Sequence, residues 1–465
     1  MYGRTHRIHF IGVGGAGMSG IAEVLLNMGY QVSGSDLRTG ESMQRLVRLG
    51  GRIFTGHAAS NIEGAQVVVY STAVPADNPE LAAARELGLP VIGRAEMLAE
   101  LMRMKYGIAV GGAHGKTTTT SMIAAVLARG GLDPTIVVGG RLHALGSNAR
   151  LGHGQFLVAE ADESDGSFLR LAPAVAVITS IDREHLDHYH DLDAVLQAFV
   201  YFANRVPFYG VAVLCADDPN VCRIVPRVTK RTLFYGTLPE TDVRADQVRL
   251  EPHGARFVVH AFGREHGEVA IQLPGRHNVL NALAAVAVGL EVGVGFDHIA
   301  ESLAGFRGVG RRFETRGEAG GVRVVDDYGH HPTEIRATLA AARGLGERVL
   351  VVFQPHRYSR TAALREEFGG AFGDAARVWV LDIYPAGEKP LPGISAHTIV
   401  EAAAGAGASH VVHAASPAAA VAAVTAEARA GDVVLTLGAG DVGKLGDAIL
   451  ERLRQGAAAL GRGRG

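Results

Sequence analysis

The sequence is poor in features that mark several large classes of protein. Its 465 residues include only two cysteines, Cys215 and Cys222, which excludes a disulfide framework, and we expect both to be small buried residues. The charge is nearly balanced, with 45 Lys and Arg against 47 Asp and Glu, so nothing favours binding to nucleic acid. No apolar run reaches the roughly 18 residues that span a membrane, and no signal segment precedes the first apolar strand. We therefore expect a cytoplasmic protein without membrane insertion.

Glycine and short aliphatic runs are abundant instead. The 61 glycines and the 48% hydrophobic content fit an α/β protein, and the length predicts more than one domain. Short apolar runs predict parallel strands. In the second block, from 135 to 218, these runs end in glycine or acidic residues, where ligands of such sheets bind, at the carboxyl ends of the strands. All of the runs lie at 7–14, 31–36, 52–56, 67–74, 135–140, 155–162, 174–182, 211–218, 321–329, 348–356, 377–385 and 432–440.

Other segments have different patterns. Residues 96–107 and 278–290 read as helices, and residues 228–271 are rich in strand-forming residues, which predicts a small antiparallel sheet. The last ten residues, "GAAALGRGRG", are expected to be disordered. The three α/β blocks share an architecture but no sequence repeat.

The first glycine loop is Gly12-x-Gly14-x-x-Gly17, between a predicted strand and a helix. Asp36 ends the next strand, 19 residues after Gly17. Glycines at this spacing let a pyrophosphate approach backbone N–H groups, and the acid suits a ribose hydroxyl. Any nucleoside diphosphate offers both groups. The loop alone therefore leaves two hypotheses open, a nicotinamide or flavin site and a UDP-type site.

The second glycine loop, Gly112-x-x-Gly115-Lys116-Thr117, also joins a strand to a helix. Its backbone can surround phosphates, Lys116 supplies a positive charge, and the Thr117 hydroxyl can reach Mg²⁺. The spacing is a variant of the usual phosphate loop, because Val110 stands where a glycine is expected.

Acidic residues and histidines follow two nearby strands and suit a metal ion. One or two of the four acids Glu160, Asp162, Glu163 and Asp165 are expected to bind Mg²⁺, and His185 and Asp187 follow the next strand. His185, His188 and His190 also suggest zinc, although their spacing fits no compact zinc site.

Six motifs occur in the order seen in the Mur ligase family of peptidoglycan synthesis, which the chain resembles over nearly its whole length. They are "GAHGKTTT", "EADESD", "HLDHY", "PGRHNVLNA", "GRRFE" and "DDYGHHPTE". The resemblance implies an α/β fold of three domains. These are a Rossmann-like UDP-sugar domain at 1–104, a central P-loop ATPase domain at 105–314 and a Rossmann-like amino-acid domain at 315–465. The first glycine loop would then hold UDP and the second ATP.

The resemblance also implies roles for particular residues. Lys116, Glu160, His185, Arg312 and His330 would be catalytic, and Thr117, Glu160 and His185 would bind Mg²⁺. The residues implied at ATP are Gly112, Ala113, His114, Gly115, Lys116, Thr117, Thr118, Asn278, Asn281, Arg312 and Asp327, the last at the ribose. The residues implied at the UDP-sugar are Gly12, Gly14, Gly15, Ala16, Gly17, Asp36, Ser71, Ser147 and Asn148.

The motifs are most similar to the branch of the family that joins L-alanine to UDP-N-acetylmuramate. Residues 187–207 contain no lysine, so the carbamylated lysine that bridges two metals in other branches is absent, as it is in this branch. The run 356–360, "HRYSR", distinguishes this branch from the muropeptide-recycling ligases, which remain an alternative. Arginines suit a small carboxylate, and the implied amino-acid site is His330, His356, Arg357 and Arg360.

Other functions remain to be weighed against a ligase. A nicotinamide-dependent oxidoreductase would leave the second loop and its acids unexplained, and a nucleotide-driven switch would leave the basic run unexplained. Histidine has a suitable pKa for a general base, but the sequence does not choose among His330, His331 and His356.

Overall fold

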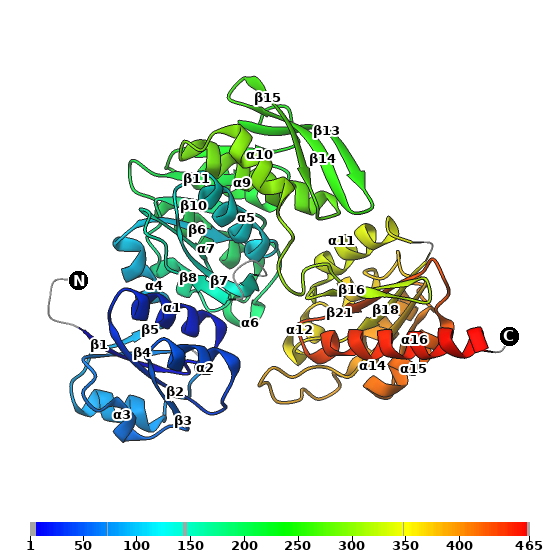
Figure 1. The fold of residues 1–465 in the computed structure, drawn as a ribbon, viewed down its shortest axis with the longest axis horizontal. Helices are drawn as coiled ribbons and strands as arrows, with labels where there is room; N and C mark the ends of the chain where they lie inside the picture. The colour runs from blue at the N-terminus through cyan, green and yellow to red at the C-terminus, as the bar shows by residue number, and fades with distance from the viewer. Residues whose placement is uncertain (1–5, 72, 143–146, 347, 463–465) are drawn as a thin grey trace.

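The computed structural model describes residues 6–71, 73–142, 147–346 and 348–462. Their strands form three sheets, in chain order, of five, ten and six strands. Figure 1 shows the first sheet (blue) below the central one (cyan to green), with the third (yellow to red) beside them. The α/β fold class expected from the sequence is confirmed.

The first sheet is parallel, with the strand order β3-β2-β1-β4-β5. Ile8 and Phe10 of β1 pack in the same apolar cluster as α1 and α4, whereas Ile11 packs with α3 on the other face. The strand β5 has only three residues, too few for a recognisable pattern. The elements are β1 (Arg7–Ile11), α1 (Ala16–Asn27), β2 (Gln31–Asp36), α2 (Glu41–Arg48), β3 (Arg52–Thr55), η1 (Ala59–Ile62), β4 (Val67–Tyr70), α3 (Pro79–Glu86), β5 (Val91–Gly93) and α4 (Arg94–Arg103).

The central sheet has the order β15-β14-β13-β12-β11-β10-β6-β9-β7-β8. Strands β13, β14 and β15 pair antiparallel, as expected for residues 228–271, but they do not form a small sheet of their own. The parallel pairs β11–β12 and β12–β13 join them to the central sheet. The strands are β6 (Tyr106–Gly111), β7 (Thr135–Leu142), β8 (Ser147–Arg150), β9 (Phe156–Glu160), β10 (Val175–Ile178), β11 (Val211–Cys215), β12 (Thr232–Gly236), β13 (Val243–Glu251), β14 (Gly254–Ala261) and β15 (Arg264–Ile271). The helices are α5 (Lys116–Arg129), η2 (Ser167–Arg170), α6 (Leu186–Tyr189), α7 (Leu192–Asn204), α8 (Pro219–Ile224), η3 (Val225–Arg227), α9 (Arg276–Glu291) and α10 (Phe296–Ala304).

The third sheet has the order β16-β17-β21-β18-β19-β20, parallel except for β16 at one edge. Helix α16 continues to Arg462, so the expected disorder from residue 456 is wrong up to that point, and residues 463–465 lie outside the described part. Alanine and leucine favour helix and prolong α16. The elements are β16 (Glu314–Ala319), β17 (Val322–Asp327), α11 (Pro332–Arg343), β18 (Val349–Phe353), α12 (Tyr358–Ala363), α13 (Arg365–Gly369), β19 (Arg377–Val380), α14 (Ala396–Gly405), β20 (Val411–His413), α15 (Pro417–Glu427), β21 (Val433–Leu437), η4 (Asp441–Lys444) and α16 (Leu445–Arg462).

The three units are joined in different ways. One buried apolar cluster runs from Phe10 and Met97 of the first unit to Phe168 and Phe199 of the central unit. The third unit has apolar clusters of its own, and polar side chains connect it to the central unit. In the described part of the chain, every helix is too short or too polar to span a membrane.

The two cysteines differ in exposure. Cys215 on β11 is buried, as expected, and burial raises the pKa of its thiol to about 12. Cys222 on α8 is exposed, so the expectation that both are buried is wrong.

Candidate active site

The second glycine loop lies between β6 and α5, at the carboxyl edge of the central sheet. Gly112 has φ +136° and Gly115 has φ +78°, a region that favours glycine. A Cβ on Gly112 would lie 2.1 Å from the Thr179 hydroxyl, and one on Gly115 would lie 2.4 Å from the Asn281 amide oxygen. Neighbouring side chains therefore hold the loop in shape, and glycine is required at both positions.

Lys116, the first residue of α5, is paired inside this loop. Its Nζ donates to the Gly112 carbonyl at 2.7 Å and to Glu163 Oε1 at 2.8 Å. Burial lowers the pKa of Lys116, but the charges of Glu163 and Glu184 outweigh this and raise it, so the amine is cationic. The acid closest to the lysine is thus Glu163, which lies three residues after the end of β9.

A possible magnesium site adjoins the lysine. Glu163, Glu184 and His185 each offer a ligand atom within 4.8 Å of those of the other two. Glu160 and Thr117 line a cavity of about 720 Å³ that Glu184 and His185 also line. Glu184 was not predicted from the sequence, although it directly precedes His185 after a strand. Burial would raise the pKa of Glu184, but His114, Arg360 and other cations lower it to about 2.

The zinc site considered from the sequence does not form. Among the described residues, no group of potential metal ligands includes His188 or His190. His188 is exposed and its ring lies against Tyr189. The histidines of residues 185–190 therefore point to different surroundings.

A cavity of about 250 Å³ lies between the second glycine loop, α9 and the third unit. Asn278 and Asn281 line it and are buried, with the Asn281 amide donating to Asn278 Oδ1 at 3.1 Å. His114, Gly115, Thr118, Arg312 and Asp327 line the same cavity. Seven of the eleven residues predicted to surround ATP therefore line one cavity, and they come from four segments of the chain.

Asp327 has internal partners within this cavity wall. Its carboxylate accepts hydrogen bonds from the N–H groups of Phe313 and Gly329, both at 2.8 Å, and from the Thr338 hydroxyl at 3.2 Å. Burial raises its pKa to about 6. These bonds give Asp327 a part in fixing the junction with the third unit, beside any contact with a ribose.

A larger cavity, of about 720 Å³, is lined by residues of all three units. The first unit contributes Gly17 and Arg94, the central unit Lys116, Thr117, Glu160 and His185, and the third unit Tyr328, His330 and Arg360. Arg312, from the connection between the central and third units, lines both cavities, and its guanidinium lies 4.9 Å from the centre of the Tyr328 ring. A phosphate at the second glycine loop and a ligand at the first could thus meet here.

The basic run of the third unit borders this cavity. Arg360 on α12 is largely buried, and its Nη2 lies 3.9 Å from Glu184 Oε1. Arg357 precedes α12 with φ +73°, is more exposed, and lies 3.9 Å from Glu388. Burial and the nearby arginines lower the pKa of His330 to about 3 and that of His356 to about 4, so both imidazoles are neutral.

Polar side chains link the second glycine loop to the start of α11. His114 Nε2 lies 2.9 Å from Asp182 Oδ2, and its Nδ1 lies 3.4 Å from Glu334 Oε1. Burial lowers the pKa of His114, but these two carboxylates raise it to about 10. The Thr333 hydroxyl donates to the same Asp182 oxygen at 2.7 Å. Asp182 and Glu334 were not identified from the sequence, because only the fold brings 182 and 334 together.

The first glycine loop is anchored to β2. The N–H groups of Gly12 and Val13 donate to the Ser35 carbonyl, and the Gly14 N–H donates to Asp36 Oδ2 at 2.9 Å. A Cβ on Gly12 would lie 3.2 Å from that of Ser71, and one on Gly17 would lie 2.6 Å from an Arg94 nitrogen. Gly15 precedes α1, which begins at Ala16.

Two predicted sugar-site residues cannot be placed at this loop. Ser147 and Asn148 belong to β8, but their side chains lie outside the described part of the structure.

Three descriptions of one family match consecutive parts of the chain. "Mur ligase family, catalytic domain" matches residues 7–106, "Mur ligase middle domain" residues 110–289, and "Mur ligase, glutamate ligase domain" residues 311–440. Each match covers one of the three sheets almost completely.

Full-length relatives are similar along the whole chain. A UDP-N-acetylmuramate–L-alanine ligase of Geobacter sp. (strain M21) is 57% identical over 98% of this chain and 99% of its own. One of Syntrophotalea carbinolica is 57% identical over 98% of this chain and all of its own. The crystal structure of the UDP-N-acetylmuramate–alanine ligase of Thermotoga maritima superposes with a TM-score of 0.78 at 29% identity, covering 97% and 99% of the two chains.

Proposed function

From the premise that the chain belongs to the Mur ligase family, we propose that it uses ATP to join L-alanine to the carboxylate of UDP-N-acetylmuramate. The observation that carries the proposal is the cavity of about 720 Å³, which residues of all three units line. A reaction that joins a sugar carboxylate, a phosphate and an amino acid needs a place where three sites meet. Two relatives that are 57% identical over essentially the full length of the chain are named as this ligase.

The chemistry is an activation followed by an acyl transfer. The sugar carboxylate attacks the γ-phosphorus of ATP, which gives an acyl phosphate and ADP. The amine of L-alanine then attacks the acyl carbon, and the tetrahedral intermediate expels inorganic phosphate. The protein must hold the reactants in line and offset the negative charge that develops on oxygen.

We assign the charge stabilisation to Lys116 and Arg312. Lys116 is cationic, and a phosphate at the loop would replace its present partner, Glu163. Arg312 lines both the nucleotide cavity and the central cavity, so it can contact a phosphoryl group that moves between them. Asn278 and Asn281 would bind the base at the other end of the nucleotide cavity.

We assign Mg²⁺ to Thr117, Glu160 and His185, with Glu163 and Glu184 beside them. The residues fit the ion, because carboxylate and hydroxyl oxygens are hard ligands and converge at the phosphate loop. When bound, Mg²⁺ would offset phosphate charge. His185 has φ +55°, which places its side chain at the start of α6, toward the acids.

We assign the amino acid to the basic run of the third unit, with Arg360 nearest the central cavity. Arg360 lines the central cavity, and together with Arg357 it also lines a smaller cavity nearby. Arg360 can therefore bind the carboxylate of an amino acid where the two cavities adjoin. His330 and His356 are neutral and can accept a hydrogen bond from the incoming amine. We assign the UDP-sugar to the first glycine loop, with Arg94 at the pyrophosphate end.

The competing functions fit these features less well. A nicotinamide-dependent oxidoreductase has no use for Lys116 and its acids, and family membership argues against it. A nucleotide switch does not need a cavity shared by three units. A muropeptide-recycling ligase is disfavoured by the names of the relatives at 57% identity. We propose a cytoplasmic location, where ATP is available.

An amino-acid panel with UDP-N-acetylmuramate, ATP and Mg²⁺ tests the proposal. We expect phosphate release with L-alanine, and a product whose mass is that of the sugar nucleotide plus alanine minus water. Phosphate release that needs a tripeptide instead would identify a recycling ligase. ATP hydrolysis that is independent of any amino acid would indicate a switch.

A further inference from the structure

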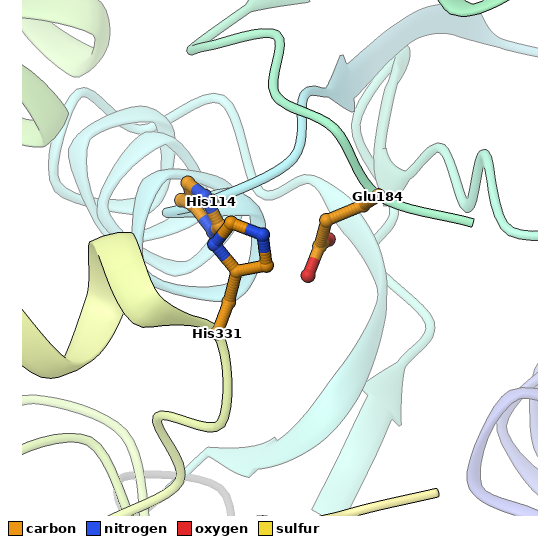
Figure 2. Close-up of side chains that lie close together, drawn as sticks. All are labelled: His114, Glu184 and His331. Carbon is orange, nitrogen blue, oxygen red and sulfur yellow. The ribbon is translucent and has the colours of Figure 1, made fainter. Parts of the chain in front are cut away.

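Three buried polar atoms meet where the second glycine loop contacts the third unit. They are His114 Nδ1, Glu184 Oε1 and His331 Nε2, and none of them makes a hydrogen bond, although Glu334 Oε1 lies 3.4 Å from His114 Nδ1 and Arg360 Nη2 lies 3.9 Å from Glu184 Oε1. One potential ligand atom of each residue lies within 4.8 Å of those of the other two. Figure 2 shows the two imidazoles close together, with the ring of His331 facing the Glu184 carboxylate. Buried polar atoms without hydrogen bonds are rare, and three in one place suit a ligand.

The other nitrogen of each imidazole faces a single carboxylate oxygen. Asp182 Oδ2 lies 2.9 Å from His114 Nε2 and 3.5 Å from His331 Nδ1. The Thr333 hydroxyl donates to this oxygen at 2.7 Å and fixes it, while the Thr333 N–H donates to His331 Nδ1 at 3.3 Å. For His114, the carboxylate is the usual support of a metal-binding imidazole, because it holds a proton on the nitrogen that faces away from the metal. A metal on His331 Nε2 would leave Nδ1 protonated, and Nδ1 would then face Asp182 in place of the Thr333 N–H.

We propose that His114, Glu184 and His331 form a binding site for Zn²⁺ or a similar divalent transition metal. Two imidazoles and one carboxylate suit such a metal, whereas Mg²⁺ prefers oxygen ligands. At Zn–N and Zn–O distances of about 2.0–2.2 Å, ligand atoms on one zinc lie roughly 3.3 Å apart in tetrahedral geometry. Each pair must therefore close by no more than about 1.5 Å, which side-chain rotation can supply.

This site is distinct from the proposed magnesium site, although Glu184 belongs to both groups. The magnesium group adds Glu163 and His185, and the transition-metal group adds His114 and His331. His114 and Glu184 come from the central unit, and His331 precedes α11 of the third unit. The metal therefore binds only when these two units are in contact, and it holds them together. Bound zinc should slow turnover, because a clamped third unit retains its products.

The test is a titration of the metal-free full chain with Co²⁺, which reports its coordination by visible absorption, in a large excess of Mg²⁺. We expect one Co²⁺ per chain with the absorption of a four- or five-coordinate site, displaced by one equivalent of Zn²⁺. His331→Gln and His114→Gln should each abolish this spectrum. Asp182→Asn should weaken Zn²⁺ binding about 10- to 100-fold, because it removes the carboxylate that supports the His114 imidazole.

Two controls separate this site from other histidines. His185→Ala should retain the Co²⁺ spectrum, and so should the double variant of the exposed His188 and His190 to alanine. Loss of the spectrum in His185→Ala with retention in His331→Gln would assign the metal to the magnesium site and overturn the proposal. An unchanged spectrum in both His114→Gln and His331→Gln, or none in the unmodified chain, would also overturn it. Circular dichroism of each metal-free variant verifies that it is folded.

Discussion

The two glycine loops follow the same plan and differ in where their positive charge comes from. The second loop carries its own cation, Lys116, already paired with Glu163 of the same unit. The first loop has no cation, and its Gly14 N–H is occupied by the Asp36 carboxylate. Its nearest positive charge is Arg94, which also binds Asp162 of the central unit at 3.0 Å.

The second loop therefore has its positive charge in place before a ligand binds, whereas the first loop shares its positive charge with the central unit. The second loop is held by Thr179 and Asn281, so a phosphate finds its donors and its charge in place and only needs to replace Glu163. At the first loop, the charge for a pyrophosphate is tied to the neighbouring unit through Arg94. Changes at the second loop should therefore abolish chemistry, whereas changes at the first should weaken one ligand.

The largest effect is expected from removing the cation of the second loop. Lys116→Ala should abolish ATP-dependent ligation, because the other cation of the loop, His114, is already paired with Asp182 and Glu334 and cannot offset the charge of the transferred phosphoryl group. UDP-N-acetylmuramate should still bind, since its site lies on the first loop. Isothermal titration with the sugar nucleotide and a phosphate-release assay measure the two properties. Normal turnover would show that the loop does not bind ATP.

Adding a methyl group to each loop should sharpen the comparison. Gly115→Ala places a Cβ 2.4 Å from Asn281 at φ +78°, and strain of about 1–3 kcal/mol predicts a roughly 10- to 100-fold loss in kcat/KM for ATP. Gly14→Ala is the matched control: its Cβ would lie 2.9 Å from the movable Asp36 carboxylate. It should affect the KM of the sugar nucleotide and leave that of ATP nearly unchanged. Equal losses for both substrates in both variants would contradict separate sites.

Much of this arrangement was predictable from the sequence because it is local. A strand, a glycine turn and a helix are contiguous in the sequence. The second loop and its place at a strand end were therefore predicted from Gly112, Lys116 and Thr117. Most parallel strands of the three units were found from short aliphatic runs, whereas the parallel strand β12 was placed in the segment expected to be antiparallel. The three-residue strands β5 and β20 were not found, because such short segments carry no periodic signal.

The parts that could not be predicted depend on contacts between distant segments. Glu163 is one of four acids in a short stretch, and only the fold shows that it is the one paired with Lys116. Asp182 and Glu334 lie far apart in sequence, and their meeting at His114 depends on how the third unit docks. The strands β12 to β15 were correctly expected to pair, but their continuity with the central sheet depends on the β11–β12 contact.

The proposed amino-acid site has no glycine loop and relies on arginine side chains. We expect a change at one of these arginines to have an effect of intermediate size on the use of L-alanine. Arg360→Lys keeps the charge but loses the planar fork, which should raise the KM for L-alanine roughly 10- to 100-fold for a lost charged hydrogen bond. The KM values for ATP and UDP-N-acetylmuramate should change much less. Arg357→Lys is the matched variant at a more exposed position, and its effect should be smaller. Initial rates with each substrate varied in turn decide this. A change in the KM for ATP alone would assign residues 356–360 to the nucleotide site.

A smaller effect is expected at the acid of the first loop. Asp36→Ala removes the partner of the Gly14 N–H and a candidate ribose contact, and should weaken sugar-nucleotide binding by about 1–2 kcal/mol, or roughly tenfold. ATP affinity should be unchanged. Binding of NADH at micromolar concentration that no UDP compound displaces would contradict the assignment of this loop.

The smallest effect is expected in how stability depends on pH near each loop. Beside the second loop, His114 has its pKa raised to about 10 by Asp182 and Glu334, against the lowering effect of burial. A raised histidine pKa stabilises the fold fully below the unfolded value of about 6.5, and this contribution is lost as pH rises toward 10. Near the first loop, buried Glu80 accepts a hydrogen bond from the Ser35 hydroxyl. Burial raises its pKa, but the adjacent His9 imidazole and the hydrogen bonds from Ser35 and Asn61 outweigh this and lower it to about 2.

The two groups should therefore lose their contributions at opposite ends of the pH scale. That of Glu80 is present above about pH 4.5 and lost as pH falls toward 2, so Glu80→Gln should flatten the acid limb of the stability curve. His114→Gln should flatten the alkaline limb between about pH 6.5 and 10, and it should also weaken the acid limb, because His114 lowers the pKa of Asp182 and Glu334. Each pKa unit is worth about 1.4 kcal/mol, so even a third of the His114 shift is measurable by urea unfolding across this range. An alkaline limb that is identical in His114→Gln and the unmodified chain would show that His114 is neutral in the folded protein. The second loop would then have Lys116 as its only cation, and the contact with α11 would be a hydrogen bond between neutral imidazole and carboxylate.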